Sequence, residues 1–227
     1  NSEEMQSNLI AQNIKIIQSE INTIAEKKVK LIAVSKKKPL AMIEQAFDLG
    51  INDFGENFAQ ELKEKAETSS KNITWHFIGP IQSNKIKDIA KYSNWVHSIE
   101  REKVAKKLNE HALMHNKTIN SLIQVNVDSE NSKSGVSLDT LFELKDFILE
   151  NCENLNLRGL MFMPRFTLDK DEKDESLKKI CLVISKFKNI YKDADTFSFG
   201  TTHDYKLSIK NGSNMIRVGE KIFGKRV

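Results

Sequence analysis

The stretch LIAVSKKKPLAMIEQAFDLGINDFGEN (residues 31–57) decides the fold, because it contains a strand, a helix and a second strand in succession. Residues 31–35 are an apolar run of the kind that forms a buried strand, and residues 53–57 form a second one. Between them, Pro39 suits the first turn of a helix, and Gly50 suits the left-handed position after its last turn. The stretch therefore predicts a parallel βαβ unit.

Further apolar runs repeat this pattern along the chain. They are WHFIG (75–79), WVHSI (95–99), LIQVNV (122–127), LRGLMF (157–162), TFSFG (196–200) and MIRVG (215–219). Most are separated by stretches with the period of an amphipathic helix, so eight strands alternate with helices. The sequence predicts an α/β protein, a single (β/α)8 TIM barrel over residues 28–227. Residues 1–27 are expected to add an N-terminal packing helix, because they place isoleucines on one helical face.

Composition and charge argue against several classes of protein. The 35 basic and 31 acidic side chains are interleaved and leave a net charge of +4, which does not indicate a basic face for nucleic acid. No apolar run approaches the length of a membrane span, and the polar, acidic first residues are unlike a signal peptide. Cys152 and Cys181 lack a metal-ligand spacing and indicate no disulfide. We therefore expect a cytoplasmic protein without a nucleic-acid, membrane or metal partner.

A lysine follows the first predicted strand. In a parallel barrel the C-terminal ends of the strands share one rim, and such barrels carry their sites there. Lys36 comes directly after an apolar run, so its side chain is expected to be partly desolvated at this rim. Desolvation favours the neutral amine, which can form a Schiff base. The alternative is that Lys36 is an ordinary solvated member of the run KKK (36–38).

Small and hydroxyl residues follow the last two predicted strands, in SFGTT (198–202) and RVGE (217–220). Backbone N–H groups in such loops can approach an anion closely, and these barrels often bind phosphate after their seventh and eighth strands. The alternative is a pair of ordinary tight turns. A rim lysine opposite a phosphate site suits an aldehyde that carries a phosphate, and pyridoxal 5′-phosphate has both groups.

Longer motifs occur in order over nearly the whole chain. They are AVSK (33–36), FGEN (54–57), WHFIGPIQSNK (75–85), NSKSG (131–135), RGLM (158–161), GTTHD (200–204), IRVG (216–219) and IFG (222–224). With these motifs the chain resembles the YggS/PROSC family of pyridoxal-phosphate-binding homeostasis proteins. That family is similar to the N-terminal barrel of alanine racemase, a fold-type III cofactor enzyme.

The resemblance implies roles for residues around the cofactor ring. Lys36 would hold pyridoxal 5′-phosphate as a Schiff base, and Arg217 would face the pyridine nitrogen. Asn57 and His76 would line the ring pocket. For His76 the alternative is an interior histidine whose hydrogen bonds are satisfied by the protein itself.

The resemblance also implies a phosphate site. Backbone N–H groups of Gly219 and Glu220 would hold the phosphate, together with the hydroxyl of Ser198 or Thr202, and the choice between these hydroxyls stays open. Relatives commonly have glycine-methionine-serine where this chain has GTT (200–202), which keeps a hydroxyl. Glu220 replaces a small or hydroxyl residue, so its carboxylate must turn away from the phosphate.

The implied function is intracellular pyridoxal phosphate homeostasis, by storage or delivery of the cofactor, with apo-enzymes as recipients and a monomer as the expected state. An arginine beside the pyridine nitrogen disfavours its protonation and weakens the ring as an electron sink, so no residue is assigned a catalytic role. The alternative is a weak amino-acid racemase that uses Tyr205 or His203. Against it, eight residues follow Gly219 in the sequence, and we therefore do not expect the domain that completes alanine racemases.

Overall fold

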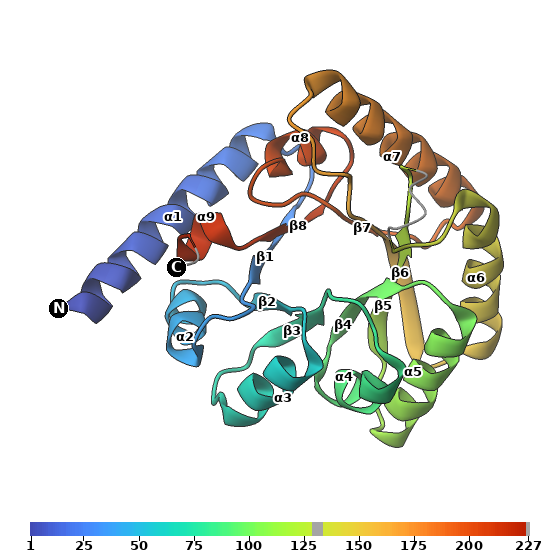
Figure 1. Cartoon of the computed structure of the whole chain (residues 1–227), viewed down its shortest axis with the longest axis horizontal. Coiled ribbons are helices and arrows are strands. Elements are labelled where there is room, and N and C mark those ends of the chain that lie inside the picture. The colour runs from blue at the N-terminus through green and yellow to red at the C-terminus, as the bar shows by residue number, and fades with distance from the viewer. Residues whose placement is uncertain (129–133, 226–227) are drawn as a thin grey trace.

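Eight parallel strands close into a barrel in the computed structural model, which describes residues 1–128 and 134–225. In chain order the strands are β1 (Lys30–Val34), β2 (Asp53–Glu56), β3 (Thr74–Phe77), β4 (Trp95–Ile99), β5 (Ile119–Val125), β6 (Leu155–Phe162), β7 (Thr196–Ser198) and β8 (Met215–Val218). Each strand pairs with its neighbours in the chain, and β8 completes the ring by pairing with β1 (Figure 1). The predicted (β/α)8 barrel is confirmed.

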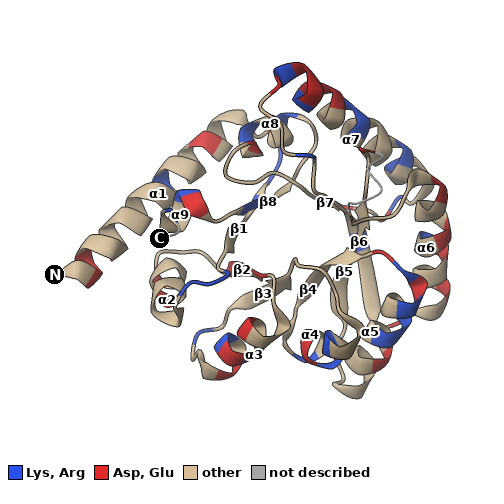
Figure 2. Ribbon diagram, viewed as in Figure 1, with Lys and Arg blue, Asp and Glu red and all other residues tan. Residues whose placement is uncertain are grey.

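Helices surround the barrel. They are α1 (Ser2–Ile24), α2 (Leu40–Asp48), α3 (Ala59–Thr68), the 3₁₀ turn η1 (Ser83–Lys85), α4 (Ile86–Tyr92), α5 (Glu102–Met114), α6 (Leu138–Asn151), α7 (Lys170–Ile190), α8 (Tyr205–Lys210) and α9 (Glu220–Phe223). Charged side chains of both signs are distributed over the helices around the barrel (Figure 2). No helix among the described residues combines the length and the apolar character that crossing a bilayer requires.

In the first βαβ unit, proline and glycine mark the two ends of α2, as the sequence predicts. Pro39, with φ −67° and ψ 150°, is the N-cap of α2, one residue before the first turn in which it was expected. Gly50 follows the C-cap with φ +106°, a left-handed conformation that glycine adopts at little cost. The chain then returns to place β2 beside β1, with Ala33 paired with Phe54.

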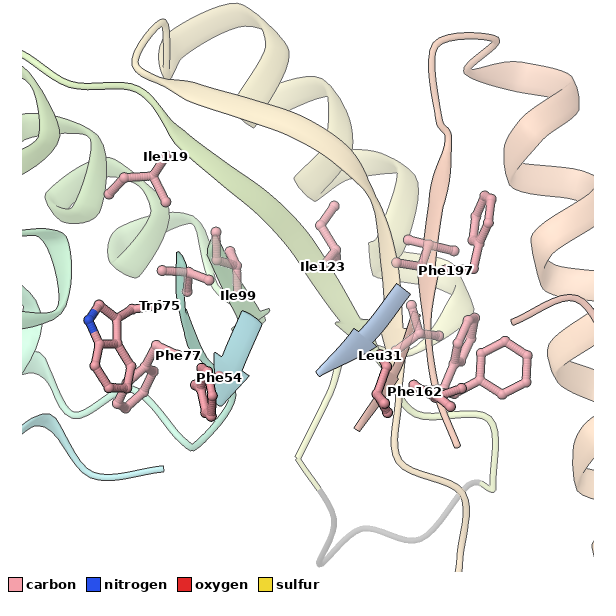
Figure 3. Close-up of a cluster of buried hydrophobic side chains, with 14 of the residues drawn as sticks. Leu31, Phe54, Trp75, Phe77, Ile99, Ile119, Ile123, Phe162 and Phe197 are labelled. Atoms are coloured by element: carbon pink, nitrogen blue, oxygen red, sulfur yellow. The ribbon is translucent and has the colours of Figure 1, made fainter. Parts of the chain in front are cut away.

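Strand side chains alternate between the layer under the helices and the interior of the barrel. The outer layer is the main hydrophobic core, and its large side chains include Phe54, Trp75, Phe77, Phe162 and Phe197 (Figure 3). A smaller apolar cluster fills part of the interior and consists of Ile32, Trp95, Leu122, Met161 and Met215. Other interior positions carry buried polar side chains.

Helix α1 packs outside the barrel against α2, α8 and α9 (Figure 1). Four isoleucines of its predicted apolar face are buried: Ile10, Ile14, Ile17 and Ile21. Beside this face, Glu20 accepts hydrogen bonds from Lys206 of α8 and Lys221 of α9, each at 2.9 Å. The two ammonium groups lower the pKa of Glu20 to about 2. Apolar packing and ion pairs therefore both attach α1 to the last helices of the barrel.

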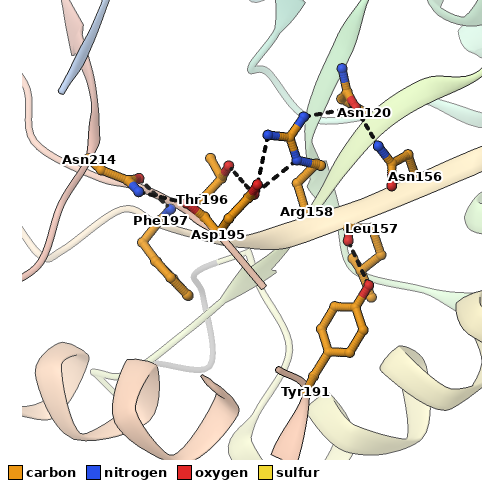
Figure 4. Close-up of polar contacts among 9 residues, drawn as sticks. All are labelled: Asn120, Asn156, Leu157, Arg158, Tyr191, Asp195, Thr196, Phe197 and Asn214. Carbon is orange, nitrogen blue, oxygen red and sulfur yellow. Dashed lines mark hydrogen bonds and ion pairs between the residues drawn. The ribbon is translucent and has the colours of Figure 1, made fainter. Parts of the chain in front are cut away.

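A polar network lies at the N-terminal ends of the strands (Figure 4). Arg158 donates two hydrogen bonds of 2.9 Å to Asp195, and its guanidinium lies 4.8 Å from the ring centroid of Trp95. Asn214 donates to the Asp195 carbonyl at 2.7 Å and accepts from the backbone N–H of Phe197 at 2.8 Å. Bidentate arginine–carboxylate pairs hold a fixed geometry. The polar groups at this end of the barrel are thus bonded to one another.

Replacing Ile17 with alanine is expected to lower the free energy of unfolding by about 2–4 kcal/mol, because its side chain is fully buried under α1. Ile16→Ala is the matched control, since Ile16 is 45% exposed and its loss should change stability by no more than about 0.5 kcal/mol. Urea unfolding monitored by circular dichroism measures both. Equal losses for the two variants would contradict the docking of this helical face.

Candidate functional site

The C-terminal rim of the barrel brings together residues from both ends of the sequence. Lys36 follows β1 and Asn57 follows β2, while Thr202 lies in the loop after β7 and Gly219 follows β8. These four strands are consecutive around the closed sheet. Lys36, Gly219 and Glu220 line one pocket of about 610 Å³. The barrel closure therefore places the predicted lysine beside the predicted phosphate loop.

The backbone before Lys36 is held by buried polar groups. Ser35 is fully buried, and its hydroxyl donates to Glu56 at 2.5 Å while its N–H donates to the Gly55 carbonyl at 3.0 Å. Lys65 of α3 donates to both the Ser35 carbonyl and the Glu56 carboxylate at 2.8 Å. Burial raises the pKa of Glu56, and the ammonium of Lys65 partly opposes that rise. Sequence reasoning missed this pair, although Glu56 lies in the motif FGEN (54–57) and Lys65 follows it in the next predicted helix.

The residue after Lys36 adopts a left-handed turn. Lys37 has φ +60°, and its backbone N–H donates to the Glu61 carboxylate at 2.8 Å. The side chain of Lys36 is exposed, so the partial desolvation expected from the sequence is not found. The amine is therefore open to solvent while the backbone that carries it is fixed.

The loops after β7 and β8 present unused donors. Within residues 1–128 and 134–225, the backbone N–H groups of Thr202, Gly219 and Glu220 donate to no acceptor. The Thr202 hydroxyl accepts from the N–H of Lys221 at 3.3 Å, so its own proton can still be donated. Small residues and free N–H groups at this spacing suit an anion such as phosphate.

The side chain of Glu220 turns toward a neighbouring loop. Its carboxylate lies 3.9 Å from Nε2 of His203, and both side chains are largely exposed. The other rim residue considered as an acid or base, Tyr205, is 1% exposed and accepts a 2.8 Å hydrogen bond from Lys221. Tyr205 is thus packed beneath the rim, and only His203 of these two candidates is open to solvent.

Asn57 has a buried side-chain oxygen with no hydrogen-bond partner among the described residues. The adjacent loop approaches it so closely that a Cβ atom on Gly79 would lie 2.2 Å from the Asn57 carbonyl oxygen. Position 79 therefore requires glycine. An unpaired amide oxygen is a ready acceptor for a ligand group, because leaving it unpaired costs free energy.

Arg217 lies within the barrel, just below the open rim. Its Nη1 donates to the Ser198 carbonyl at 3.0 Å and the Ser198 hydroxyl at 2.5 Å, and its Nη2 donates to the Phe162 carbonyl at 3.0 Å. Burial lowers the pKa of Arg217 to about 10, so the guanidinium is charged at neutral pH. It also lines a pocket of about 110 Å³ with Met163 and Thr201 at the rim. The Ser198 hydroxyl is thus engaged inside the barrel, unlike that of Thr202.

His76 lies deeper in the barrel than the rim residues. Its Nε2 lies 2.7 Å from Asp53 at the start of β2, and its Nδ1 lies 2.8 Å from Nε2 of His97. The ring also stacks on Trp95, with centroids 5.4 Å apart. Nδ1 of His97 lies 3.0 Å from the Ser198 hydroxyl. Sequence analysis assigned no partner to His97, although strand alternation places it on the same inner face as Trp95.

Metal binding and the NSKSG motif complete the comparison with the sequence. The described residues contain no cluster of three or more histidine, cysteine, aspartate or glutamate side chains that could hold a metal ion. In the motif NSKSG (131–135), residues 131–133 lie outside the described residues. Gly135 is described, has φ +116° and donates its N–H to Glu100 at 2.5 Å.

Comparisons with known sequences agree with the motifs. The family model "Alanine racemase, N-terminal domain" matches residues 6–227. The pyridoxal phosphate homeostasis protein of Haemophilus influenzae is 39% identical over 228 residues, covering 96% of each chain. The protein of the same name from Buchnera aphidicola (subsp. Acyrthosiphon pisum) is 43% identical over 199 residues, which are 87% of this chain and 98% of that relative.

Solved structures share the barrel. PipY of Synechococcus elongatus, in a structure with PLP bound, has a TM-score of 0.84 and 27% identity, covering 95% of this chain and all of that one. An alanine racemase from Clostridium difficile has a TM-score of 0.77, and the match covers 95% of this chain and 57% of that one. At 13% identity this second likeness shows the fold alone.

The two buried histidines predict how stability depends on pH. Burial lowers the pKa of His76 and lowers that of His97 well below 6.5, the value of an unfolded histidine. Below pH 6.5 the unfolded chain therefore binds protons that the folded chain does not, and the free energy of unfolding falls as the pH falls. Urea titrations of the protein without ligand at pH 7.5, 6.5 and 5.5 should show this decrease.

His97→Gln is the control, because it removes the more strongly shifted group and should flatten the decrease. Glu56 contributes in the opposite direction, since its raised pKa stabilises the folded state as the pH falls. The comparison of wild type with His97→Gln cancels that contribution. Parallel pH profiles for the two proteins would contradict a neutral, buried His97.

Proposed function

Because the chain belongs to the pyridoxal phosphate homeostasis protein family, we propose that it binds pyridoxal 5′-phosphate at the C-terminal rim of the barrel and stores or delivers this cofactor. The observation that carries the proposal is the meeting of Lys36 with unused N–H donors of Thr202, Gly219 and Glu220 around one rim. An amine and an anion site that line one pocket suit the two ends of one ligand.

Pyridoxal phosphate supplies an aldehyde that a lysine amine can capture and a dianionic phosphate that needs hydrogen-bond donors. Lys36 would provide the amine, on a backbone held by Ser35, Glu56 and Lys65. The buried, unpaired oxygen of Asn57 would face the ligand. These groups fit the cofactor because each has a chemical capacity that the protein itself leaves unused.

Of the two hydroxyls predicted for the phosphate, we assign Thr202. Its proton is free at the rim, whereas Ser198 already accepts from Arg217 and lies beside His97. The exposed carboxylate of Glu220 leans toward His203, which leaves the backbone N–H of Glu220 available to an anion. The phosphate site would thus depend mainly on backbone donors, with one hydroxyl added.

Arg217 supports storage in preference to catalysis. A charged guanidinium near the pyridine nitrogen would disfavour protonation of that nitrogen, and an unprotonated ring is a weak electron sink. Racemisation also needs an acid or base on the second face of the substrate, and Tyr205 is buried against Lys221. The cytoplasmic location, the monomeric state and the apo-enzyme recipients remain predictions from the sequence.

Borohydride reduction of the protein loaded with pyridoxal phosphate is expected to attach the cofactor to Lys36 and to no other lysine of the run 36–38. The reason is position, since strand alternation from Ile32 directs Lys36 toward the barrel mouth. Mass-spectrometric peptide mapping identifies the labelled residue. Lys38→Ala should keep the label and Lys36→Ala should lose it with an unchanged unfolding midpoint. Label found mainly on Lys37 or Lys38 would overturn the assignment.

Thr202→Ala is expected to weaken pyridoxal phosphate binding by about 1–2 kcal/mol, the usual loss for one hydrogen bond to a charged group. Thr201→Ala is the matched control in the same loop, because the Thr201 hydroxyl contacts only Asp204, at 3.4 Å, among the described residues. Equilibrium dialysis with pyridoxal phosphate and with pyridoxal measures both. An equal loss of pyridoxal affinity in Thr202→Ala would show that this hydroxyl does not contact the phosphate.

A further inference from the structure

A continuous chain of polar side chains crosses the interior of the barrel. It runs from Arg217 on β8 through Ser198 on β7, His97 on β4 and His76 on β3 to Asp53 on β2. Successive polar atoms are separated by 2.5, 3.0, 2.8 and 2.7 Å. All five residues are buried, and the two histidines have no exposed surface. The chain thus connects the rim to the opposite end of the barrel.

The carboxylate at one end of the chain fixes the direction of the hydrogen bonds. A carboxylate can only accept, so Nε2–H of His76 donates to Asp53. His76 is neutral, because burial lowers its pKa, and its Nδ1 is therefore an acceptor for Nε2–H of His97.

The same argument continues to the arginine. His97 is also neutral, because burial lowers its pKa, and its Nδ1 accepts the hydroxyl proton of Ser198. Arginine can only donate, so the Ser198 oxygen accepts from Arg217. Every bond has the same direction, from a cation to a carboxylate, and bonds aligned in this way polarise one another. Lys30 lies 3.6 Å from Asp53 and balances its charge.

Arg217 has hydrogen-bond donors near the rim that the protein does not use. Of its five N–H groups, three donate to Ser198 and Phe162, which leaves the Nε–H and one Nη2–H without an acceptor in the described part of the chain. The side chain also lines a rim pocket, which is separate from the pocket that Lys36 lines. The bonds to Ser198 and Phe162 hold the plane of the guanidinium, and so they determine where the unused donors point.

We propose that His97, His76 and Asp53 are positioning residues, which act through Ser198 to hold Arg217 with its unused donors directed at the cofactor ring. This inference rests on the proposed function, because it assigns Arg217 to pyridoxal phosphate. It also assigns Ser198 to the arginine and not to the phosphate. The two histidines contact no ligand in this arrangement.

The first experiment tests the chain without any cofactor. Nitrogen-15 NMR of the apo-protein is expected to show His97 and His76 as neutral rings protonated on Nε2 and unprotonated on Nδ1. A proton on Nδ1 of His97, or a doubly protonated ring at neutral pH, would overturn the chain. This result does not depend on whether pyridoxal phosphate binds.

The second experiment measures the effect on the ring. Ser198→Ala removes only the hydroxyl that joins Arg217 to His97, and it is expected to weaken the binding of pyridoxal phosphate and of pyridoxal by the same factor, about tenfold. A shift in the absorption band of the bound ligand should accompany this loss. A loss seen with pyridoxal phosphate but not with pyridoxal would place Ser198 on the phosphate and overturn the inference.

Two variants of His97 provide the matched comparison. His97→Gln can accept from Ser198 and donate to His76, so it should retain the affinity and absorption band of wild type. His97→Leu can do neither and should resemble Ser198→Ala. The inference fails if wild type binds the cofactor and all three variants bind it with the same affinity as wild type. Urea titration must show that the variants are folded. If wild type binds no pyridoxal phosphate, the proposed function fails while the NMR result still decides the chain.

Discussion

The pairing of β1 with β8 is the contact on which the candidate site depends. Leu31 lies beside Ile216 and Ala33 beside Val218, so the first strand and the last run parallel with their C-terminal ends at one rim. Closure removes both edges of the sheet, and it also brings together segments that are about as far apart in sequence as the chain allows. Without this pairing, the lysine after β1 and the free N–H groups after β8 would belong to no common surface.

Features set by neighbouring residues could be predicted from the sequence. The spacing of apolar runs gave eight strands, the isoleucine period gave the buried face of α1, and Gly50 marked the end of α2 with its positive φ. Pro39 was misplaced by one residue because N-cap and first-turn positions both accept its fixed φ. Lys36 was correctly expected at the rim, since strand ends determine that position.

Features set by contacts between separate strands, helices and loops could not be predicted. The exposure of Lys36 depends on the surrounding loops, and the buried Glu56 and Lys65 meet only when α3 folds against β2. Ser198 was one of two equivalent hydroxyls in the sequence, and its engagement with Arg217 requires the register between β7 and β8. His97 had no visible partner because its neighbours come from β3 and β7. The sequence shows which side chains face inward but not which of them touch.

The packing of α1 has a consequence for the order of events during synthesis. This helix precedes all eight strands, whereas two of the three helices that cover it, α8 and α9, follow β7 and β8. Until they emerge, its row of isoleucines has only α2 as a partner. Exposed apolar faces make incomplete chains prone to aggregation. A nascent chain of this protein therefore exposes the apolar face of α1 until the last strands and helices of the barrel have been made, and such a surface is of the kind that chaperones bind.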